Sequence, residues 1–521
     1  MLATLGTQVA SDLELSELSK NIPFQTSWGK DTFQTQLTKC STSPKDIRRK
    51  QLPLFVLTKQ EKTRNKIRSY LDELAPKIQT VDECFHTTDP RIKELITQVL
   101  WKTESVGSIL NTSPIFLNTF IAWKTLFLPG FAILMPLLLL IVPFFVQKMV
   151  IPDLEVSNYL EHLKAILLKQ ISIPNFLQSR GANDRVGFFL ESMFIGLTIV
   201  MFISSLWNQI TNSLHLRAIW QDIWESGSSI RSLRDTVSNM VNELRAMPLR
   251  EQRGFRHLLE KGEEALKKTK GMIGLDNVAT FGLIWNDPTE LSQLKDWIGT
   301  MDVLVAISGL PNICYPTLRS KLGYDIVDVY HPSLKTCVPN SIQSDGHVLL
   351  TGPNRGGKST FCKTVGIALI TAQSWGFVYA KRMTFCPYSV ITTVLEPCGK
   401  LGVVSTFEAE IEFAKTVLAS KTFPMFVMMD EIFHSTNAMD GQSASHVFLE
   451  QLYKLSGINS VVSTHYIQLA SEFKEATALK LVTNDKDDST LEYTYRVAPG
   501  VSNKSSVMEI LRERGLLKQG K

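Results

Sequence analysis

The sequence predicts a C-terminal α/β domain preceded by a mainly α-helical region that contains a two-helix transmembrane hairpin. Three observations support this prediction. Strands and helices alternate between residues 346 and 500, a glycine-rich segment at 351–360 lies between an apolar run and a helical one, and two long apolar stretches precede residue 210. At 521 residues the chain is long enough for about two to four domains, each with its own core.

The composition excludes several classes of protein. Hydrophobic residues make up 44% of the chain and charged residues 20%, which is typical of an ordered protein. A net charge of +5 permits contact with nucleic acid or anionic lipid but requires neither. The seven cysteines are scattered without a C-x-x-C pair, which indicates a reducing, intracellular compartment and argues against a zinc ribbon. The first residues lack the pattern of a signal peptide.

Residues 1–103 are predicted to form an N-terminal helical and basic region. Between Lys45 and Arg68 the chain carries nine Lys or Arg against two acids. Such a stretch suits the phosphates of DNA or an anionic membrane surface. A solvated helix face is the simpler alternative, and the sequence leaves both open.

Residues 104–210 are predicted to contain the transmembrane hairpin, with spans at about 125–146 and 188–207. The first span, Thr125–Val146, has 22 residues without a charge, which matches the thickness of a bilayer core. Its prolines at 129, 136 and 143 are tolerated in a membrane helix where neighbouring groups satisfy the freed carbonyls. A buried helix of a soluble core is the alternative.

The second span is shorter and centres on Ser192–Trp207. Gly187–Leu190 extends it but brings in Glu191, and Trp207 would lie at the level of the membrane interface. A helix in a core or a dimer interface is the alternative. Residues 211–325 are then predicted to be mainly helical, since apolar side chains such as Leu214, Ile219 and Ile223 fall on one face.

Residues 326–521 are predicted to form a nucleotide-binding α/β domain. The segment Thr351–Thr360 reads T-G-P-N-R-G-G-K-S-T, and it follows the apolar run His347–Leu350 and precedes a helical run. This context and spacing are those of a phosphate-binding loop, in which backbone N–H groups and the helix dipole hold phosphate oxygens. We expect ATP to contact Gly352, Pro353, Asn354, Arg355, Gly356, Gly357, Lys358, Ser359 and Thr360.

Within this loop two side chains have distinct predicted roles. Lys358 is expected to reach the β- and γ-phosphates, and Ser359 is expected to hold a Mg²⁺ ion. Seventy residues later, an apolar run ends in Asp430 and Glu431. Asp430 is predicted to bind the same Mg²⁺, largely through water, and Glu431 is predicted to polarise the attacking water.

A third polar strand end is predicted at Ser463-Thr464-His465-Tyr466. His465 is a candidate for contacting the γ-phosphate or the attacking water, although a purely structural histidine is the commoner case. We therefore predict Lys358, Glu431 and His465 as the catalytic residues. Between these motifs, Ser405 and Thr406 begin a helix and are candidates either for an anion site or for a simple N-cap.

These motifs together resemble the ATPase domain of the MutS family of DNA mismatch-repair proteins. The resemblance covers about residues 331–516, and its phosphate loop differs from the family pattern only at Arg355, where methionine is usual. The remaining matching elements are His331-Pro332, Val338-Pro339-Asn340, Ser405-Thr406-Phe407 with Glu410, Asp430-Glu431-Ile432 through Asp440-Gly441, Ser463-Thr464-His465-Tyr466, and the closing segment from Tyr495 through Leu516.

The resemblance implies an ABC-type P-loop ATPase that works as a homodimer or heterodimer. Ser405 and Thr406 would then act in trans on the γ-phosphate of the partner subunit, and 433–440 would lie along the dimer seam. His331 would flank the adenine, and the helices of 208–300 would act as a lever-like layer. Phe433-His434-Ser435 replaces the usual Gly-Arg-Gly, and the N-terminal third does not resemble a mismatch-recognition domain.

Three hypotheses follow for the function. The main one is a membrane-anchored, homodimeric MutS-like ATPase whose ATPase domain faces the cytosol and couples ATP and Mg²⁺ to movement of its helical region. The positive-inside rule opposes this orientation mildly, because the loop 148–186 holds five basic residues. The alternative is a DNA-binding MutS-like clamp acting in mismatch repair or recombination. The third is a nucleotide switch that assembles partners with little turnover.

Overall fold

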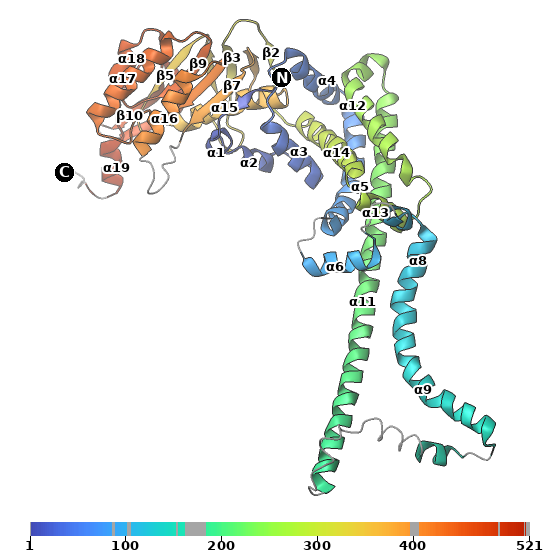
Figure 1. Cartoon of the computed structure of the whole chain (residues 1–521). Coiled ribbons are helices and arrows are strands. Elements are labelled where there is room, and N and C mark those ends of the chain that lie inside the picture. The colour runs from blue at the N-terminus through green and yellow to red at the C-terminus, as the bar shows by residue number, and fades with distance from the viewer. Residues whose placement is uncertain are drawn as a thin grey trace. The chain divides into compact units, whose positions relative to one another are not determined.

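The computed structural model describes residues 2–85, 89–101, 106–152, 155–161, 184–395, 406–487, 490–514 and 516. The chain divides into two compact units. Unit 1 comprises Met1–Ala75, Thr236–Leu266 and Gln293–Lys521, and unit 2 comprises Pro76–Asp235 and Lys267–Ser292. Figure 1 labels the elements of both units. The domain boundaries at 103, 210 and 325 stay predictions.

A seven-stranded sheet forms the centre of unit 1. Its strand order is β1-β7-β8-β9-β5-β10-β11, and every neighbouring pair is parallel except the antiparallel β10 and β11. All residues of β5, β8 and β9 are buried, as expected of a parallel sheet covered on both faces. The strands are β1 (Thr4–Leu5), β5 (His347–Thr351), β7 (Val390–Val394), β8 (Met425–Met429), β9 (Ile458–Ser463), β10 (Ala476–Asp487) and β11 (Thr490–Pro499).

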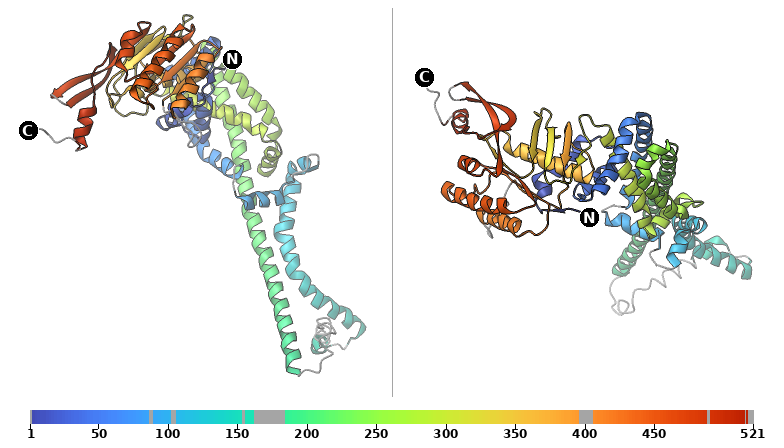
Figure 2. Two further views of the ribbon diagram at one scale, coloured as in Figure 1. Left: turned by 60° about the vertical axis from the view of Figure 1, so that its left-hand side comes forward. Right: turned by 90° about the horizontal axis from the view of Figure 1, so that it is seen from above.

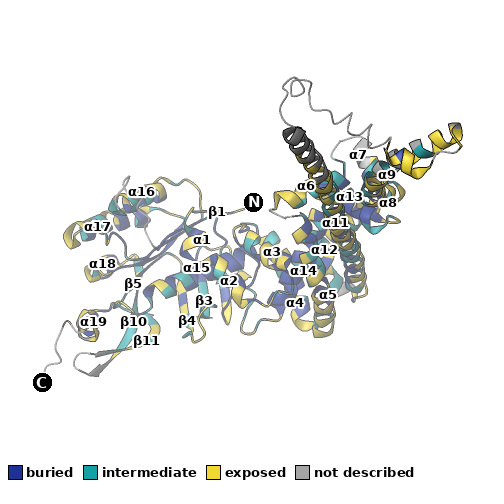
Figure 3. Ribbon diagram, turned by 90° about the horizontal axis from the view of Figure 1, so that it is seen from below, coloured by how far each residue is buried: buried dark blue, intermediate teal, exposed yellow. Residues whose placement is uncertain are grey.

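Helices pack on this sheet, and a smaller four-stranded sheet of order β2-β6-β3-β4 accompanies it. Figure 3 shows buried residues gathered along the strands and the inner faces of the helices. The predicted C-terminal α/β domain is confirmed. Its further elements are α15 (Lys358–Ser374), α16 (Thr406–Ala419), α17 (Ala438–Lys454), α18 (Ile467–Glu472), α19 (Val507–Glu513), β2 (Thr317–Leu318), β3 (Tyr324–Val329), β4 (Asn340–Ser344) and β6 (Arg382–Phe385).

The N-terminal segment belongs to the same sheet, which the sequence did not indicate. Strand β1 extends the sheet beyond β7, with Thr4 opposite Val390. Leu13 follows the short helix α1 (Val9–Asp12) and packs against α15 so closely that a Cβ on Gly366 would lie 2.8 Å from its Cδ2 atom. The N-terminal segment therefore covers the helix that begins at the phosphate loop.

The remaining helices of unit 1 come from three stretches of the chain. Phe33 stacks on Trp375 at the end of α15, and the Trp297 Nε1–H donates to the carbonyl of Leu258 at 2.8 Å. The first contact joins α3 to the end of α15, and the second joins α14 to α12. The helices are α2 (Leu15–Leu18), η1 (Ser19–Asn21), α3 (Ser27–Leu37), α4 (Pro44–Lys59), α5 (Glu61–Phe85), α12 (Leu249–Lys268) and α14 (Thr289–Ser308). The helices α5, α11, α12 and α14 contribute residues to both units.

The basic stretch from Lys45 to Arg68 lies on α4 and α5, and part of its charge is used within the fold. Lys50 donates to the carbonyl of Ser374 at 2.6 Å, and Arg64 donates to that of Ser308 at 3.1 Å. A nucleic-acid or lipid surface on these helices stays a prediction.

Unit 2 is entirely helical among its described residues, which confirms the prediction of a helical region before the α/β domain. The first predicted span lies in η2 and α9, the second lies in α11, and α9 bends away from α11 towards its C-terminal end (Figure 2). Its helices are α6 (Pro90–Val99), α7 (Val106–Asn111), α8 (Pro114–Ala122), the π-helical turn η2 (Trp123–Phe127), α9 (Leu128–Val150), α11 (Asp184–Arg245), η3 (Thr269–Met272) and α13 (Asn277–Asn286).

The described residues contain one segment that is long and apolar enough to cross a membrane, where the sequence predicts two. It runs from Pro114 to Met135, and only 11% of its most apolar window is buried. It begins earlier than the predicted first span because α8, η2 and the start of α9 form one continuous helical rod. The side chains of much of 188–200 are outside the described set, so the second span stays a prediction.

Pro129 leaves one backbone carbonyl of this rod without its helical hydrogen bond, and a neighbouring helix supplies another donor. Pro129 has no N–H to donate to the carbonyl of Thr125, four residues earlier, and the π-helical turn Trp123–Phe127 directly precedes it. Ser213 of α11 donates its hydroxyl to that same carbonyl at 2.6 Å. This hydrogen bond holds α11 against the rod. It also satisfies the carbonyl of Thr125 without water.

The packing of α11 on α13 supports a first prediction. A Cβ atom on Gly227 would lie 1.8 Å from the backbone oxygen of Asn277, and backbone cannot rotate away. We expect Gly227→Ala to destabilise the protein by about 2 kcal/mol or more, because the helices must separate. Thermal unfolding followed by circular dichroism measures the effect.

Gly196→Ala in the same helix is the matched control, since no atom lies within 4 Å of its added Cβ. That variant should be neutral or more stable by up to about 1 kcal/mol, from helix propensity alone. Equal melting temperatures for the two variants would contradict the close approach of α11 and α13.

Candidate nucleotide-binding site

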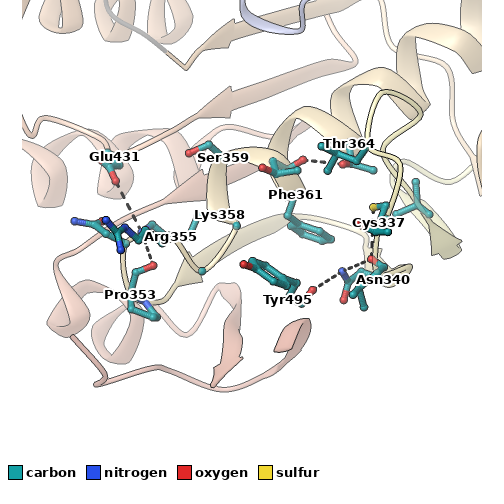
Figure 4. Close-up of a pocket in the computed structure, with 18 residues that line it drawn as sticks. Cys337, Asn340, Pro353, Arg355, Lys358, Ser359, Phe361, Thr364, Glu431 and Tyr495 are labelled. Atoms are coloured by element: carbon teal, nitrogen blue, oxygen red, sulfur yellow. Dashed lines mark hydrogen bonds and ion pairs between the residues drawn. The ribbon is translucent and has the colours of Figure 1, made fainter. Parts of the chain in front are cut away.

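The glycine-rich segment forms a turn between β5 and α15, as the sequence predicts. Gly357 has φ +98°, a conformation that favours glycine, and it is the residue before Lys358, where α15 begins. Gly352 approaches Leu481 so closely that a Cβ would lie 3.0 Å from the Leu481 Cβ. All predicted loop residues from Pro353 to Thr360 line a pocket of about 450 Å³ (Figure 4). The first turn of α15 therefore opens directly into this pocket.

Lys358 is the buried cation of the site, with 4% of its surface exposed. Its Nζ donates to the carbonyls of Gly352 at 3.1 Å and Pro353 at 3.4 Å, and lies 3.8 Å from a carboxylate oxygen of Glu431. Burial lowers the pKa of Lys358, while Glu431 and Asp430 oppose this shift. A bound phosphate would supply the negative charge that this buried ammonium group favours.

Asp430 and Glu431 follow the last residue of β8 and are held by the end of β9. Ser463 donates its hydroxyl to Asp430, and its oxygen accepts the backbone N–H of Glu431 at 2.9 Å. The N–H of Thr464 donates to the carbonyl of Leu350 at 3.0 Å, so the ends of β8 and β9 are tied to the strand that leads into the phosphate loop.

His465 lies against Glu431, with 2.7 Å between its Nε2 and a carboxylate oxygen. The hydrogen bond from His465 is the main reason why the pKa of Glu431 is lowered, and the charges of His465 and Lys358 add to it. Glu431 therefore stays ionised and fixed in direction. The three predicted catalytic residues, Lys358, Glu431 and His465, are brought together at the carboxyl ends of the parallel strands, where α/β proteins commonly bind ligands.

The predicted Mg²⁺ ligands fit the chemistry of that ion. Ser359 lines the pocket and Asp430 directly follows β8, and both side chains supply hard oxygen donors. The described residues contain no cluster of three or more His, Cys, Asp or Glu that would enclose a metal ion. Mg²⁺ usually keeps several waters and binds one or two protein oxygens together with substrate phosphates, and Ser359 and Asp430 are of this kind.

The other wall of the pocket comes from segments that the sequence analysis did not assign to the site. Tyr495 of β11 lines it, and its carbonyl accepts from Asn340 Nδ2 at 2.9 Å. Asn340 Oδ1 in turn accepts the N–H of Val497 at 2.8 Å, so the start of β4 is joined to β11. The sequence signals for this wall were the Val338-Pro339-Asn340 element and the closing segment that begins at Tyr495, neither of which was assigned to the ATP site. The other lining residues on this side are Val329, Leu334, Thr336, Cys337, Val338, Phe361 and Thr364.

His331, predicted to flank the adenine, is not among the described lining residues of this pocket, although its N–H donates to Sγ of the lining residue Cys337 at 3.3 Å. It is only 8% exposed, and its Nδ1 accepts the N–H of Ser333 at 3.3 Å. Burial is the main reason why its pKa is lowered. The role of His331 at the base stays a prediction.

Ser405 and Thr406 are the two residues predicted to act on the γ-phosphate of the partner subunit. Ser405 is outside the described residues, and Thr406 begins α16. The same helix carries Glu410, which is 2% exposed and accepts the hydroxyl of Ser435 at 2.9 Å. His434 Nδ1 lies 2.8 Å from the carbonyl of Glu431. The helix that starts at Thr406 is thus joined, through residues that differ from the family pattern, to the backbone of the acidic strand end.

Arg355 points out of the loop rather than along it. Its backbone has φ +64°, and its guanidinium pairs with the carboxylate of Glu513 on α19. The C-terminal helix is therefore attached to the phosphate loop by the one residue in which this loop departs from the family pattern.

Comparison with known proteins agrees with the sequence motifs. A family model described as MutS domain V matches residues 348–519. Endonuclease MutS2 of Thermus thermophilus is 26% identical over 299 residues, 56% of this chain and 37% of that protein. DNA mismatch repair protein MutS of Persephonella marina is 27% identical over 250 residues, 44% of this chain and 29% of that protein. Endonuclease MutS2 of Clostridioides difficile is 26% identical over 383 residues, 71% of this chain and 46% of that protein.

The chain thus spans less than half the length of the relatives it matches. The match to the family model lies within unit 1 and begins in β5, so it includes the phosphate loop and the strand ends that form the pocket.

The strand that leads into the phosphate loop carries a pH-sensitive residue. His347 is 8% exposed, lies 2.9 Å from the hydroxyl of Ser460 through Nδ1, and packs against the ring of Tyr453. Burial lowers its pKa from 6.5 to about 4. Between these values the unfolded chain binds a proton that the folded chain does not. Stability is therefore lost as the pH falls from about 6.5 towards 4.

We expect His347 to reduce the free energy of unfolding by about 2 kcal/mol between pH 7 and pH 5. His347→Gln should remove this part of the pH dependence, even if it lowers stability at pH 7. Denaturant unfolding of both proteins at the two pH values measures the difference. Parallel losses in the wild type and the variant would show that His347 takes up a proton in the folded state.

Proposed function

Because the chain belongs to the MutS family, we propose that it is a MutS-like ATPase that binds and hydrolyses ATP in the pocket at the start of α15. The observation that supports this most strongly is the convergence of Lys358, Asp430, Glu431 and His465 on the glycine-rich loop. A purely structural loop would not require a buried lysine beside a strand end that carries two acids.

The geometry supports a distinct role in ATP hydrolysis for each of these residues. Backbone N–H groups of the loop and the ammonium of Lys358 bind the β- and γ-phosphates, and Lys358 exchanges its carbonyl contacts for phosphate oxygens. Glu431 accepts from the attacking water, and His465 holds the carboxylate in place. Ser359 and Asp430 hold Mg²⁺, which neutralises phosphate charge when bound.

We further propose that the active form is a homodimer with composite sites. The described lining of the pocket includes no residue of α16, although the family resemblance gives Thr406, at its start, a role at the γ-phosphate. This separation is expected if Ser405 and Thr406 serve the pocket of the partner subunit. The contacts of Glu410 and His434 would then connect the helix that acts in trans to the acidic strand end of its own subunit.

Two observations point to different targets for the ATPase. The names of the relatives, which include DNA mismatch repair protein and endonuclease, favour DNA and a role as a clamp in mismatch repair or recombination. The exposed apolar rod from Pro114 to Met135 favours a membrane anchor, with the ATPase domain in the cytosol where ATP is available. DNA is the target that the relatives support, and the membrane is the target that the helical unit supports.

Substitution of the catalytic carboxylate tests hydrolysis and dimerisation together. Glu431→Gln keeps the shape of the side chain but cannot polarise water, so we expect at least about a hundredfold loss of turnover. ATP should then accumulate in a stable dimer. Light scattering of the purified variant with and without ATP measures the change in mass. A Glu431→Gln protein that binds ATP but stays monomeric would contradict the composite site.

Lys358→Ala is the matched control, because it removes the phosphate contact instead. That variant should bind ATP at least about tenfold more weakly and form no dimer, since a charge-assisted contact to phosphate is lost. Full ATP affinity in Lys358→Ala would contradict the assignment of the phosphate loop itself.

Fractionation of cells that express the full chain decides between the two targets. An integral anchor requires detergent for release and resists carbonate, whereas a DNA clamp is released in soluble form. If the protein acts on DNA, duplex DNA should stimulate its ATPase activity, and the stimulation should fall steeply with salt because phosphate contacts release counterions. Soluble protein without DNA stimulation would exclude both targets.

A further inference from the structure

A second cavity lies in unit 1, and it shares no lining residue with the nucleotide pocket. Its volume is about 320 Å³. The lining residues come from the N-terminal segment and from α3, α4, α12, α14 and the residue that follows α15. These six segments together line one space, and neither the family resemblance nor the proposed ATPase chemistry accounts for it.

The rim of this cavity is strongly basic. Arg49, Lys50, His257 and Lys261 line it, and Asp46 is the only acid among the described lining residues. Arg49 and Asp46 are 3.9 Å apart, so their pairing is weak. Among the described residues, Lys261 has no ion-pair partner. The rim thus holds more positive charge than the protein itself neutralises.

The excess of positive charge contributes to lowering the pKa values of two rim residues, His257 and Lys50. Burial is the main reason why the pKa of His257 is lowered, and repulsion by Lys261 and Arg49 lowers it further, with Glu260 and Asp46 opposing. Burial also lowers the pKa of Lys50 to about 8, and Lys261 contributes to that shift. An anion near the rim would relieve this repulsion.

The floor of the cavity is apolar and already formed. Trp375, Leu304 and Leu258 line it, with 4%, 3% and 9% of their surfaces exposed. Trp375 is fixed in place, because its Nε1–H donates to the carbonyl of Phe33 at 3.3 Å and its ring stacks on the Phe33 ring at 6.0 Å. An enclosed apolar floor below a charged rim suits a small molecule better than the backbone of a nucleic acid, which binds along open basic surfaces.

We propose that this cavity binds a small organic anion that carries an apolar ring. The ring would lie against Trp375 and Leu304, and a phosphate or carboxylate group would lie among Arg49, His257 and Lys261. A volume of about 320 Å³ is at the lower end for ligand pockets, which limits the ligand to about one ring system and its anionic group.

The cavity and the nucleotide pocket are at opposite ends of one helix. Lys50 donates to the carbonyl of Ser374, the last residue of α15, and Lys358 is the first residue of the same helix. The 17 residues of α15 correspond to about 25 Å. Both sites can therefore be filled at once, and binding at the cavity does not depend on the proposed ATPase function.

The proposal is tested with 4-fluorophenyl phosphate, whose fluorine signal reports binding to the full-length protein. We expect saturable binding, and at least about tenfold weaker binding of inorganic phosphate, which lacks the ring. The double variant Arg49→Gln, Lys261→Gln should bind the probe at least about tenfold more weakly, since two charge-assisted contacts are lost. Arg253→Gln, at an exposed position of α12 outside the cavity lining, is the matched control and should bind normally.

Two further outcomes separate this site from the phosphate loop. Lys358→Ala should keep its affinity for the probe. Loss of binding in that variant would place the probe in the nucleotide pocket and overturn the proposal. Absence of binding to the wild type at millimolar probe, unchanged affinity in the double variant, or equal affinity for inorganic phosphate would also overturn it.

Discussion

The site depends on the hydrogen-bonded register of three parallel strands. Strands β8, β9 and β5 are fully buried and lie next to one another in the sheet, so their backbone groups must pair with neighbouring strands rather than with water. In this register Leu350 pairs with Ser463, and Met429 pairs with Val462. The residues that follow each strand must therefore emerge side by side. A shift of one residue in either pairing would turn Asp430 and Glu431 away from Lys358.

The same constraint explains why the first residues of the chain belong to a domain whose motifs lie more than 300 residues later. Strand β7 would otherwise present an unpaired edge beside β8, and β1 covers it. Asp12 then accepts from the hydroxyl of Thr393 at 2.7 Å and the N–H of Leu395 at 3.1 Å, at the carboxyl end of β7. The N-terminal segment thus fixes the edge strand next to the acidic strand end, and truncating it would disturb the site without removing any residue that lines the pocket.

What the sequence could predict follows from how local each signal is. The phosphate loop was predictable because glycine, lysine and serine occur within one short segment between a strand and a helix. The acidic strand end and His465 were predictable because each follows a buried apolar run. The pocket wall that Asn340 and Tyr495 form was not predictable in the same way, because these two residues meet only through the tertiary fold. A strand as short as β1 gives no periodic signal at all, and the Ser213 contact depends on two helices whose pairing the sequence does not specify.

The exposed apolar rod from Pro114 to Met135 bears on the choice between the two proposed targets, DNA and a membrane. Leu126, Phe131 and Leu134 are 70%, 45% and 50% exposed, and burying one such side chain is worth about 1.5–3 kcal/mol. A surface of this kind needs an apolar cover, and DNA, a polyanion, cannot provide one. Lipid would provide such a cover, and so would an apolar protein surface, and the carbonyl of Thr125 is already paired with Ser213 as either environment requires. A role on DNA therefore requires a further apolar partner for this rod, whereas a role at a membrane does not.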